Sequence, residues 1–453
     1  MTLMYFLMSS LTSMSTRMLN NMSKQMMLMG SGLIAMPTMY DWSEMNVYYT
    51  TDGMADVLML LTAYLMPMSM MSNWNNMKNT LYFELVLNLG IILLMNFMCQ
   101  DMTSFYIYFE ASLAPLFMMM GLYGAANKDK AADYMLIYTL FSSLFMLLAI
   151  AMYEMLLNNT DYQATSLLVL SMDLQCMLFL AMSMGMAVKT PLAPVHTWLP
   201  VVHSESPLAG SMLLAGVILK LAVYAIMRLM LPTLSDAAML YTPFVYVLCV
   251  MTMIYTSMMT LRQTDLKVMM AYSSMSHMTV CILGMLSNTL TGMSGSLMLS
   301  MAHGFVSPGL FIMVGGMLYD RYHNRLMYYF QGLLTYMPWL AVYLMMLSFC
   351  NTGTPLSLNF MGELLSLSGA INRAPFLGAL AATSVLLSAS YQMKITNRLT
   401  GGVITPYISL TADCTYRESF LMWALIIPTI FFGFFPNSML NMIWESSNLI
   451  YNF

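Results

Sequence analysis

Long apolar segments, separated by short polar connectors, follow one another along almost the whole chain. A helix that crosses a lipid bilayer needs about 20 mostly apolar residues. Two weaker segments near the start, 1–14 and 25–40, approach this pattern. Thirteen stronger segments fit it: 54–71, 80–100, 102–123, 131–157, 168–190, 207–231, 238–260, 266–287, 290–319, 330–350, 354–371, 374–395 and 419–436. The pattern predicts an all-α, polytopic membrane protein that forms a single membrane domain.

The composition agrees with this class and excludes others. The chain has 453 residues, of which 59% are apolar and 8% are charged, whereas a soluble domain has about 25% charged residues. The few charges gather in the connectors, at 127–130, 321–325 and 394–398. With a net charge of −4 the chain offers no basic surface for nucleic acid.

Motifs for cofactors are missing from the sequence. The six cysteines lie far apart, which favours buried apolar side chains over a disulfide framework or an iron–sulfur site. Neither GxGxxG nor GxxxxGK[ST] occurs. The 61 methionines follow the hydrophobic pattern, so we expect them to fill apolar positions and not to bind metal. The first 25 residues lack the Arg-rich pattern of a mitochondrial transit peptide, so a protein that works in an organelle would be made there.

Prolines interrupt two of the apolar segments. The chain should bend at 189–194 (KTPLAP), because proline removes an amide donor and clashes with the preceding turn. The second interruption is at 351–355 (NTGTP). A pair of interrupted segments in corresponding halves of a chain points to a transport site. An ordinary loop is the alternative, and we favour a broken helix at the first because Lys189 sits directly on it.

Four charged residues stand well inside apolar segments: Glu110, Lys189, Lys220 and Glu363. A charge at the bilayer centre costs about 2.5–3.5 kcal/mol on insertion scales, so such residues are functional by default. A lysine that exchanges its carboxylate partner can load and release a proton, which fits proton transfer. The structural alternative is an ion pair, such as Glu110 with Lys189, that ties two helices together; the two roles are compatible.

One of these residues belongs to a regular polar stripe. Lys220, Tyr224 and Arg228 recur at intervals of four, a spacing that lines one face of a helix. Arg228 lies near the end of its segment, so we expect its side chain to extend to the membrane interface.

Histidines and hydroxyls extend the polar set. His277 lies within a turn of Ser273 and Ser274, and His303 and Ser307 are four residues apart. Each group could take part in a proton relay. The alternative is a core histidine whose nitrogens are satisfied by hydrogen bonds.

Further polar residues follow the first interruption. His196 and His203 flank a Trp-Leu-Pro sequence at the expected end of the broken helix, and zinc binding there would need further ligands that the spacing does not supply. Glu205 could cap the next helix or pair with a nearby histidine or lysine. Asp265 and Lys267 sit at a helix start, where we expect an interfacial, structural role.

Several runs of sequence resemble the antiporter-like membrane subunits of respiratory complex I. The resemblance covers about 53–400, and two of its runs are very specific, VKTPLAPVHTWLPVVHSESPLAGSMLLAGVILKLAVYAIMR and LRQTDLKVMMAYSSMSHMTV. Supporting runs are DGMADVLMLLTAYLMP, FYIYFEASLAPLF, AHGFVSPGLFIMVGGMLYDRYHNR and NFMGELLSL. The chain departs from the family's usual Ala-His-Val-Glu-Ala-Pro at 202–207 (VHSESP), but the histidine and glutamate remain.

The resemblance implies a fold of about fourteen transmembrane helices with two inverted five-helix repeats, each containing a broken helix. On that basis, N-terminal helices occupy 1–78, the repeats occupy 79–231 and 237–398, and a last helix and tail occupy 399–453.

The resemblance also implies roles for the polar residues. Glu110 would be the partner of Lys189 on the first broken helix, and Lys220 the central lysine of the next helix. His277, with His303, would belong to the polar connection in the second half, and Glu363 would be the exit-side acid on the second broken helix. His196, His203, Glu205 and His303 would have secondary roles in proton translocation.

The function implied is proton translocation coupled to electron transfer from NADH to ubiquinone in other subunits. NADH, FMN, iron–sulfur clusters and ubiquinone would be bound by those subunits, with no cofactor or metal on this chain. Expected partners are other membrane subunits, including neighbouring antiporter-like chains, and lipids such as cardiolipin, but not nucleic acid. The expected location is the mitochondrial inner membrane, with the gene in the organelle.

Three alternatives remain open at this stage. A multisubunit cation/proton antiporter shares the lysine and glutamate motifs, although a sodium site would favour clustered oxygens. A structural scaffold with an inactive channel has no need for Glu110, Lys189, Lys220 and Glu363. The membrane subunit of an energy-converting hydrogenase is the third.

Overall fold

The computed structural model describes residues 52–73, 80–407 and 411–451 of the chain. The segments predicted at 1–14 and 25–40 lie outside these residues. The first half contains α3 (Gly53–Ser72), α4 (Thr80–Met98), α5 (Met102–Ala111), α6 (Leu113–Tyr123), α7 (Lys128–Leu157), α8 (Tyr162–Ser166), α9 (Met172–Lys189), α10 (Trp198–Glu205), α11 (Leu208–Leu213), α12 (Leu219–Ala225) and α13 (Leu231–Thr233). Two π-helical segments, η3 (Leu214–Ile218) and η4 (Ile226–Met230), join α11, α12 and α13 into one continuous helix.

The second half begins with three long helices and ends with five more. It contains α14 (Ser235–Arg262), α15 (Leu266–Met285), α16 (Leu290–Phe311) with its π-helical extension η5 (Ile312–Leu318), α17 (Tyr319–Tyr322), a 3-10 turn (Met327–Tyr329), α18 (Leu333–Tyr336), α19 (Pro338–Asn351), α20 (Leu358–Arg373), α21 (Pro375–Thr400), α22 (Tyr416–Phe434) and α23 (Asn437–Tyr451).

The predicted all-α membrane architecture is confirmed. Within the described residues, eleven helices are long and apolar enough to cross a membrane, and a shorter apolar helix lies at Pro338–Asn351. All thirteen strong segments fall on helices. The segment predicted at 330–350 is divided into the short helix α18 and the longer α19. Pro338 occupies the first turn of α19, where a missing amide costs nothing. The helix α23 was not predicted, because its sequence is too polar to read as a span.

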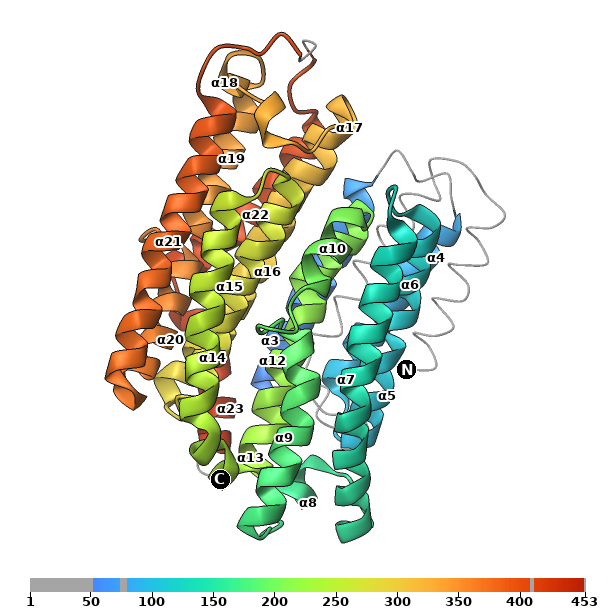
Figure 1. Ribbon diagram of the computed structural model, residues 1–453, viewed down its shortest axis with the longest axis vertical. Coiled ribbons are helices and arrows are strands. Elements are labelled where there is room, and N and C mark those ends of the chain that lie inside the picture. The colour runs from blue at the N-terminus through green and yellow to red at the C-terminus, as the bar shows by residue number, and fades with distance from the viewer. Residues whose placement is uncertain (1–51, 74–79, 408–410, 452–453) are drawn as a thin grey trace.

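Both proline interruptions separate helices, as predicted. The first gap lies between α9, which ends at Lys189, and α10, which begins at Trp198. The second lies between α19, which ends at Asn351, and α20, which begins at Leu358. Figure 1 shows the helices as a tall bundle, with α4 to α7 on one side and α14, α15 and α19 to α21 on the other. The helices α3, α10 and α12 run between these two groups.

Short polar side chains set where several helices begin. The side chain of the residue before the helix accepts a hydrogen bond from an amide of the first turn, which would otherwise lack a partner. Asp265 does this for α15, Thr289 for α16 and Ser357 for α20. Thr415 and Glu418 form a reciprocal capping box at the start of α22.

The most buried helix, α16, packs closely against α20 through glycines. A Cβ atom on Gly295 would lie 2.5 Å from the backbone nitrogen of Ser366, and one on Gly362 would lie 2.6 Å from that of Leu299. Small residues allow this approach, which provides much of the packing between helices in a membrane. The contact places the second broken helix directly against the centre of the molecule.

The Gly362→Ala variant is expected to destabilise the chain by ~1–3 kcal/mol, because the added methyl group meets backbone atoms that have no room to move. The measurement is the amount of this chain found in the assembled complex. The matched control is Gly121→Ala, since a Cβ there has no atom within 4 Å. Equal amounts of the two variants would contradict the close packing of α16 and α20.

At one end of the bundle, two aspartates tie the start of α5 to the segment before α8. The backbones of Asp101 and Asp161 form an antiparallel bridge, with a 3.0 Å hydrogen bond from the Met102 amide to the Thr160 carbonyl. Burial, followed by the hydrogen bond and the charge of Asp161, raises the pKa of Asp101 to about 6. Asp161 shows the opposite shift, because hydrogen bonds from Asp101 and then Asn159 lower its pKa.

This bridge is expected to loosen as the pH rises. The folded state holds the Asp101 proton more tightly than the unfolded chain, so the contribution of this group is full at low pH and is lost as the pH rises through about 6. Asp101→Asn mimics the protonated form. At pH 7.5, the variant's amides in peptides 99–105 and 159–165 should therefore exchange with deuterium more slowly than the native ones. The difference between the two proteins should vanish at pH 4. Slower exchange in the native protein than in the variant at pH 7.5 would contradict the raised pKa of Asp101.

Candidate functional site

The centre of the site is Lys220, which is fully buried at the start of α12, directly after the π-helical segment η3. Its ammonium group donates a hydrogen bond to the Ala215 carbonyl and lies 2.7 Å from Nδ1 of His303 on α16. An ammonium group can only donate, so Nδ1 is the acceptor and the ring proton of the neutral imidazole is on Nε2. Lys220 and His303 therefore form a donor–acceptor pair inside the membrane domain.

The pair continues through a second histidine to a carboxylate. The rings of His303 and His277 have centroids 5.8 Å apart, and Nδ1 of His277 lies 3.1 Å from Oε1 of Glu363. All four side chains are buried, and they come from α12, α16, α15 and α20. We call Lys220, His303, His277 and Glu363 the central line. Ionisable groups inside a membrane domain are costly to bury, which marks the central line as a functional site by default.

The second interruption positions the acid at the end of the central line. Glu363 lies in the second turn of α20, whose start is capped by Ser357. The interrupting loop reverses at Gly353, where φ is +66°. A Cβ on Gly353 would lie 2.6 Å from Oε2 of Glu363, so the loop backbone covers the carboxylate directly. Glycine at this position allows both the left-handed backbone conformation and the close approach of the loop to the Glu363 carboxylate.

The first half holds the other two charges without a direct ion pair between them. The two carboxylate oxygens of Glu110 and the ammonium nitrogen of Lys189 are buried from solvent, and none of these three atoms makes a hydrogen bond. The Lys189 ammonium instead lies 4.0 Å from the ring centroid of Phe109, one residue before Glu110 on α5. The structure therefore shows no direct contact between Glu110 and Lys189. The two charges still interact electrostatically across the gap, and the aromatic ring provides the nearer stabilisation of the ammonium.

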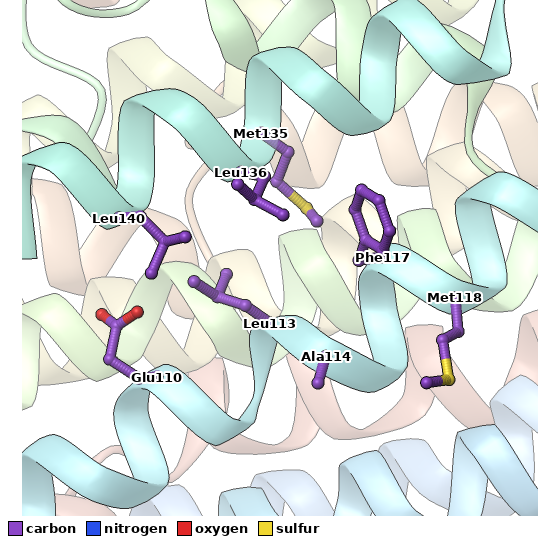
Figure 2. Close-up of a pocket in the computed structure, with 8 residues that line it drawn as sticks. All are labelled: Glu110, Leu113, Ala114, Phe117, Met118, Met135, Leu136 and Leu140. Atoms are coloured by element: carbon purple, nitrogen blue, oxygen red, sulfur yellow. The ribbon is translucent and has the colours of Figure 1, made fainter.

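The Glu110 side chain lines one end of a cavity of about 270 Å³ between α5, α6 and α7. Figure 2 shows its carboxylate at one end, with apolar side chains around the remaining space. The helix is broken beside it, because Pro115 lacks the amide that would continue the ladder from α5 into α6. The walls are Leu113, Ala114, Phe117, Met118, Met135, Leu136 and Leu140.

The secondary residues lie around α10. His203 is fully buried and stacks on Phe311 at 4.6 Å, with no hydrogen-bond partner for either ring nitrogen. The His196 ring meets the edge of Tyr255 at 5.3 Å. Glu205 accepts a 3.0 Å hydrogen bond from the Asn127 amide. In the described part of the chain, no three His, Cys, Asp or Glu side chains gather in a way that could hold a metal ion.

Some polar contacts differ from the predictions. Ser273 and Ser274 donate to carbonyls of their own helix, at 2.8 and 2.7 Å, and so do not serve His277. Hydroxyls inside helices commonly bond this way, and the sequence spacing does not exclude it. Ser307 also donates to its own helix, to the His303 carbonyl, and its hydroxyl lies 3.5 Å from the ring Nδ1 of that histidine. Arg228 forms an ion pair with Asp52, the residue before α3.

Lys267 is more than an interfacial residue, which the sequence did not indicate. Asp265 caps α15 as expected, but the Lys267 side chain is buried and its ammonium donates a 2.7 Å hydrogen bond to the Ser206 carbonyl at the end of α10. Arg325 donates to the Ser204 carbonyl and lies 3.6 Å from Glu205. These two cations hold the C-terminal end of α10. In the sequence, Lys267 was visible only as a residue at a helix start and Arg325 only as part of a charged connector.

Comparison with known proteins places the chain in a family. A sequence profile described as "NADH:quinone oxidoreductase/Mrp antiporter, TM" matches residues 99–388. NADH-ubiquinone oxidoreductase chain 4 of Debaryomyces hansenii is 76% identical, with coverage of 100% of this chain and 97% of the relative. The protein of the same name from Candida albicans is 69% identical, with coverage of 100% and 98%.

Solved structures agree with these sequence relatives. A chain of respiratory complex I from Thermus thermophilus superposes with a TM-score of 0.89 at 25% identity, with coverage of 99% of this chain and 98% of that one. A chain of the Mrp complex from Dietzia has a TM-score of 0.83 at 15% identity, with coverage of 99% and 93%, which shows a shared fold alone. The chain therefore belongs to the NADH-ubiquinone oxidoreductase chain 4 family, the antiporter-like membrane subunits of respiratory complex I.

Proposed function

We propose that this chain, as a membrane subunit of NADH:ubiquinone oxidoreductase, passes protons along Glu110, Lys189 and the central line. The observation that supports the proposal is the 2.7 Å contact between Lys220 and His303, continued to Glu363 by the 3.1 Å contact of His277. Four titratable groups from four helices meet where each costs free energy to bury. Hydrogen-bonded groups that can both hold and release a proton are what a relay requires.

The direct contacts suggest how a proton moves. Transfer from the Lys220 ammonium to Nδ1 of His303 charges the imidazole, which can then release the proton on Nε2. No direct hydrogen bond joins the described rings of His303 and His277, so this step needs a ring rotation or a bridging water. His277 then protonates Glu363. The gap at the two rings is the natural point of control, because a relay that is continuous at all times would leak protons.

The first half supplies the other arm of the path. Lys189 ends α9, which packs against α12, the helix of Lys220. When Glu110 moves toward Lys189, the ammonium gains a counter-ion; when Glu110 points into its cavity, the ammonium loses it. The two states differ in how strongly Lys189 holds its proton and repels charge at Lys220. The proposed repeats, 79–231 and 237–398, then each contribute one arm.

The energy for transport comes from outside this chain. Moving one charge against 100 mV costs about 2.3 kcal/mol. We propose that NADH, FMN, iron–sulfur clusters and ubiquinone are bound by other subunits of the complex, including partners that transmit the redox energy to this one. We further propose a location in the mitochondrial inner membrane, a gene in the organelle, contact with neighbouring antiporter-like chains and with cardiolipin, and no role in nucleic-acid binding.

The proposal is tested first with Glu110→Gln. The variant keeps the side-chain shape but cannot ionise, so we expect it to assemble and to pump fewer protons per NADH oxidised. Native gel electrophoresis with an NADH dehydrogenase stain and peptide identification shows whether the chain is in the complex. A fluorescent pH probe in reconstituted vesicles measures pumping. Unchanged pumping in an assembled complex would exclude Glu110 from the path, and a chain found only in a small assembly without NADH oxidation would contradict the function.

A further inference from the structure

The cavity beside Glu110 has the chemistry of a binding site for an amphiphilic molecule. Its volume is about 270 Å³, and seven of its eight lining residues are apolar. The eighth is Glu110, whose two carboxylate oxygens are both buried and without a hydrogen-bond partner. Ligand pockets are mostly apolar with a few placed polar groups, and this one has a single, negatively charged group.

The cavity reaches the outer surface of the helix bundle. Its inner wall is formed by Leu113 and Met135, which are 8% and 1% exposed. Its outer wall is formed by Met118 and Leu140, which are 53% and 38% exposed. These residues lie on α6 and α7, both of which belong to helices that can cross a membrane. A ligand would therefore enter from among the lipid chains, with its apolar part outward.

Charge selects the head group of that ligand. An ionised Glu110 has no ion-pair partner in direct contact, because the Lys189 ammonium lies against Phe109. An ammonium group that entered the cavity would supply the missing charge and donate hydrogen bonds to the free oxygens. A neutral or anionic head would leave the carboxylate unpaired or repel it. Water alone is the competing occupant, since the space is large enough for it.

We propose that this cavity binds an amphiphilic cation, a molecule with an ammonium head and an alkyl chain, and that its occupation stops proton exchange at Glu110. The ammonium group pairs with Glu110, and the alkyl chain runs outward between α6 and α7, past Met118 and Leu140. Long-chain amines derived from lipids and synthetic ones share this chemistry. The inhibitory consequence rests on the proposed function, whereas the binding itself does not.

The test is photo-crosslinking in the intact complex in lipid nanodiscs. The probe is dodecylammonium with a diazirine in its chain, and the control probe is the equivalent dodecanol. The ammonium probe should label the peptides that contain 113–118 and 135–140 about tenfold more than the alcohol, the factor that corresponds to 1.4 kcal/mol. Unlabelled dodecylammonium should compete with the label. Equal labelling by both probes, or none on these peptides, would overturn the proposal.

Variants locate the ligand within the chain. Ala114→Phe should fill the cavity and reduce labelling by about tenfold. The matched control is Leu144→Phe, one turn beyond Leu140 on the same exposed face of α7 but outside the cavity, and it should leave labelling unchanged. A loss of labelling in both variants, or in neither, would contradict the site. If Ala114→Phe does not assemble, the competition experiment on the native complex decides alone.

Glu110→Gln separates this inference from the proposed function. The variant should label equally with ammonium and alcohol, whatever its effect on pumping. Normal pumping with the ammonium preference lost would overturn the proposed role of Glu110 in transport and leave the binding site standing. Impaired pumping with the ammonium preference intact would overturn the binding site and leave the transport role standing.

Discussion

Replacement of Lys220 by methionine is expected to slow proton transfer through this chain by about 100-fold, while the complex still assembles and oxidises NADH. The factor is the lower end of what a positioned acid or base contributes to a proton transfer. Lys220 is the sole donor to Nδ1 of His303 that approaches within 3 Å among the described residues. Removal of a buried charge in favour of an apolar side chain of similar length is often tolerated, so folding should survive. The measurement is the number of protons moved per NADH oxidised in reconstituted vesicles.

Lys220→Arg distinguishes a relay from a structural charge. Arginine keeps the positive charge but does not release its proton in proteins. A relay therefore fails in this variant, whereas a charge needed only for packing or pairing is kept. The matched control is Lys394→Arg, an exposed lysine that donates to the Leu261 carbonyl at one end of α21. Normal pumping by Lys220→Arg would show that Lys220 does not exchange protons.

Glu363→Gln is expected to reduce pumping as strongly as the loss of Lys220. The amide preserves the side-chain shape and still occupies the space against Gly353. It cannot take a proton from His277, so the central line ends one group early. The same vesicle assay, with the rate of NADH oxidation measured in parallel, reports the effect.

The conservative variant and a surface control make this result specific. Glu363→Asp retains a carboxyl group and should recover part of the pumping, although its shorter side chain reaches less far toward His277. Glu154→Gln removes an exposed carboxylate from α7 and should have no effect. If Glu363→Asp were as inactive as Glu363→Gln, the position would be required for its geometry and not for proton exchange.

Hydropathy was enough to predict the membrane fold and the costly residues. Apolar length located the spans, because a bilayer requires about 20 apolar residues per helix. The cost of burial singled out Glu110, Lys189, Lys220 and Glu363 before any contact was known. The prolines predicted both helix interruptions, because proline lacks the amide that continues a helix. Both are confirmed, between α9 and α10 and between α19 and α20. Each of these predictions depends on local sequence alone.

The contacts between these residues could not be predicted in the same way. Lys220 and His303 are 83 residues apart, and η3 changes the turn that precedes the lysine, so helical spacing does not give the direction of its side chain. The pairing of Glu110 with Lys189 was expected from the family, yet the ammonium lies against Phe109. Lys267 looked interfacial because it begins a helix, and only the packing of α10 on α15 shows that it is buried.

The central claim is that Lys220 and Glu363 belong to one proton path, and a double variant tests it most directly. Pumping per NADH is measured for Lys220→Met, for Glu363→Gln and for the two together. If the residues act in series, each single variant already closes the path. The double variant should then pump as many protons per NADH as the single variant that pumps fewer, and no less. Independent losses that multiply in the double variant would mean that the two residues serve separate routes, and would contradict the central line.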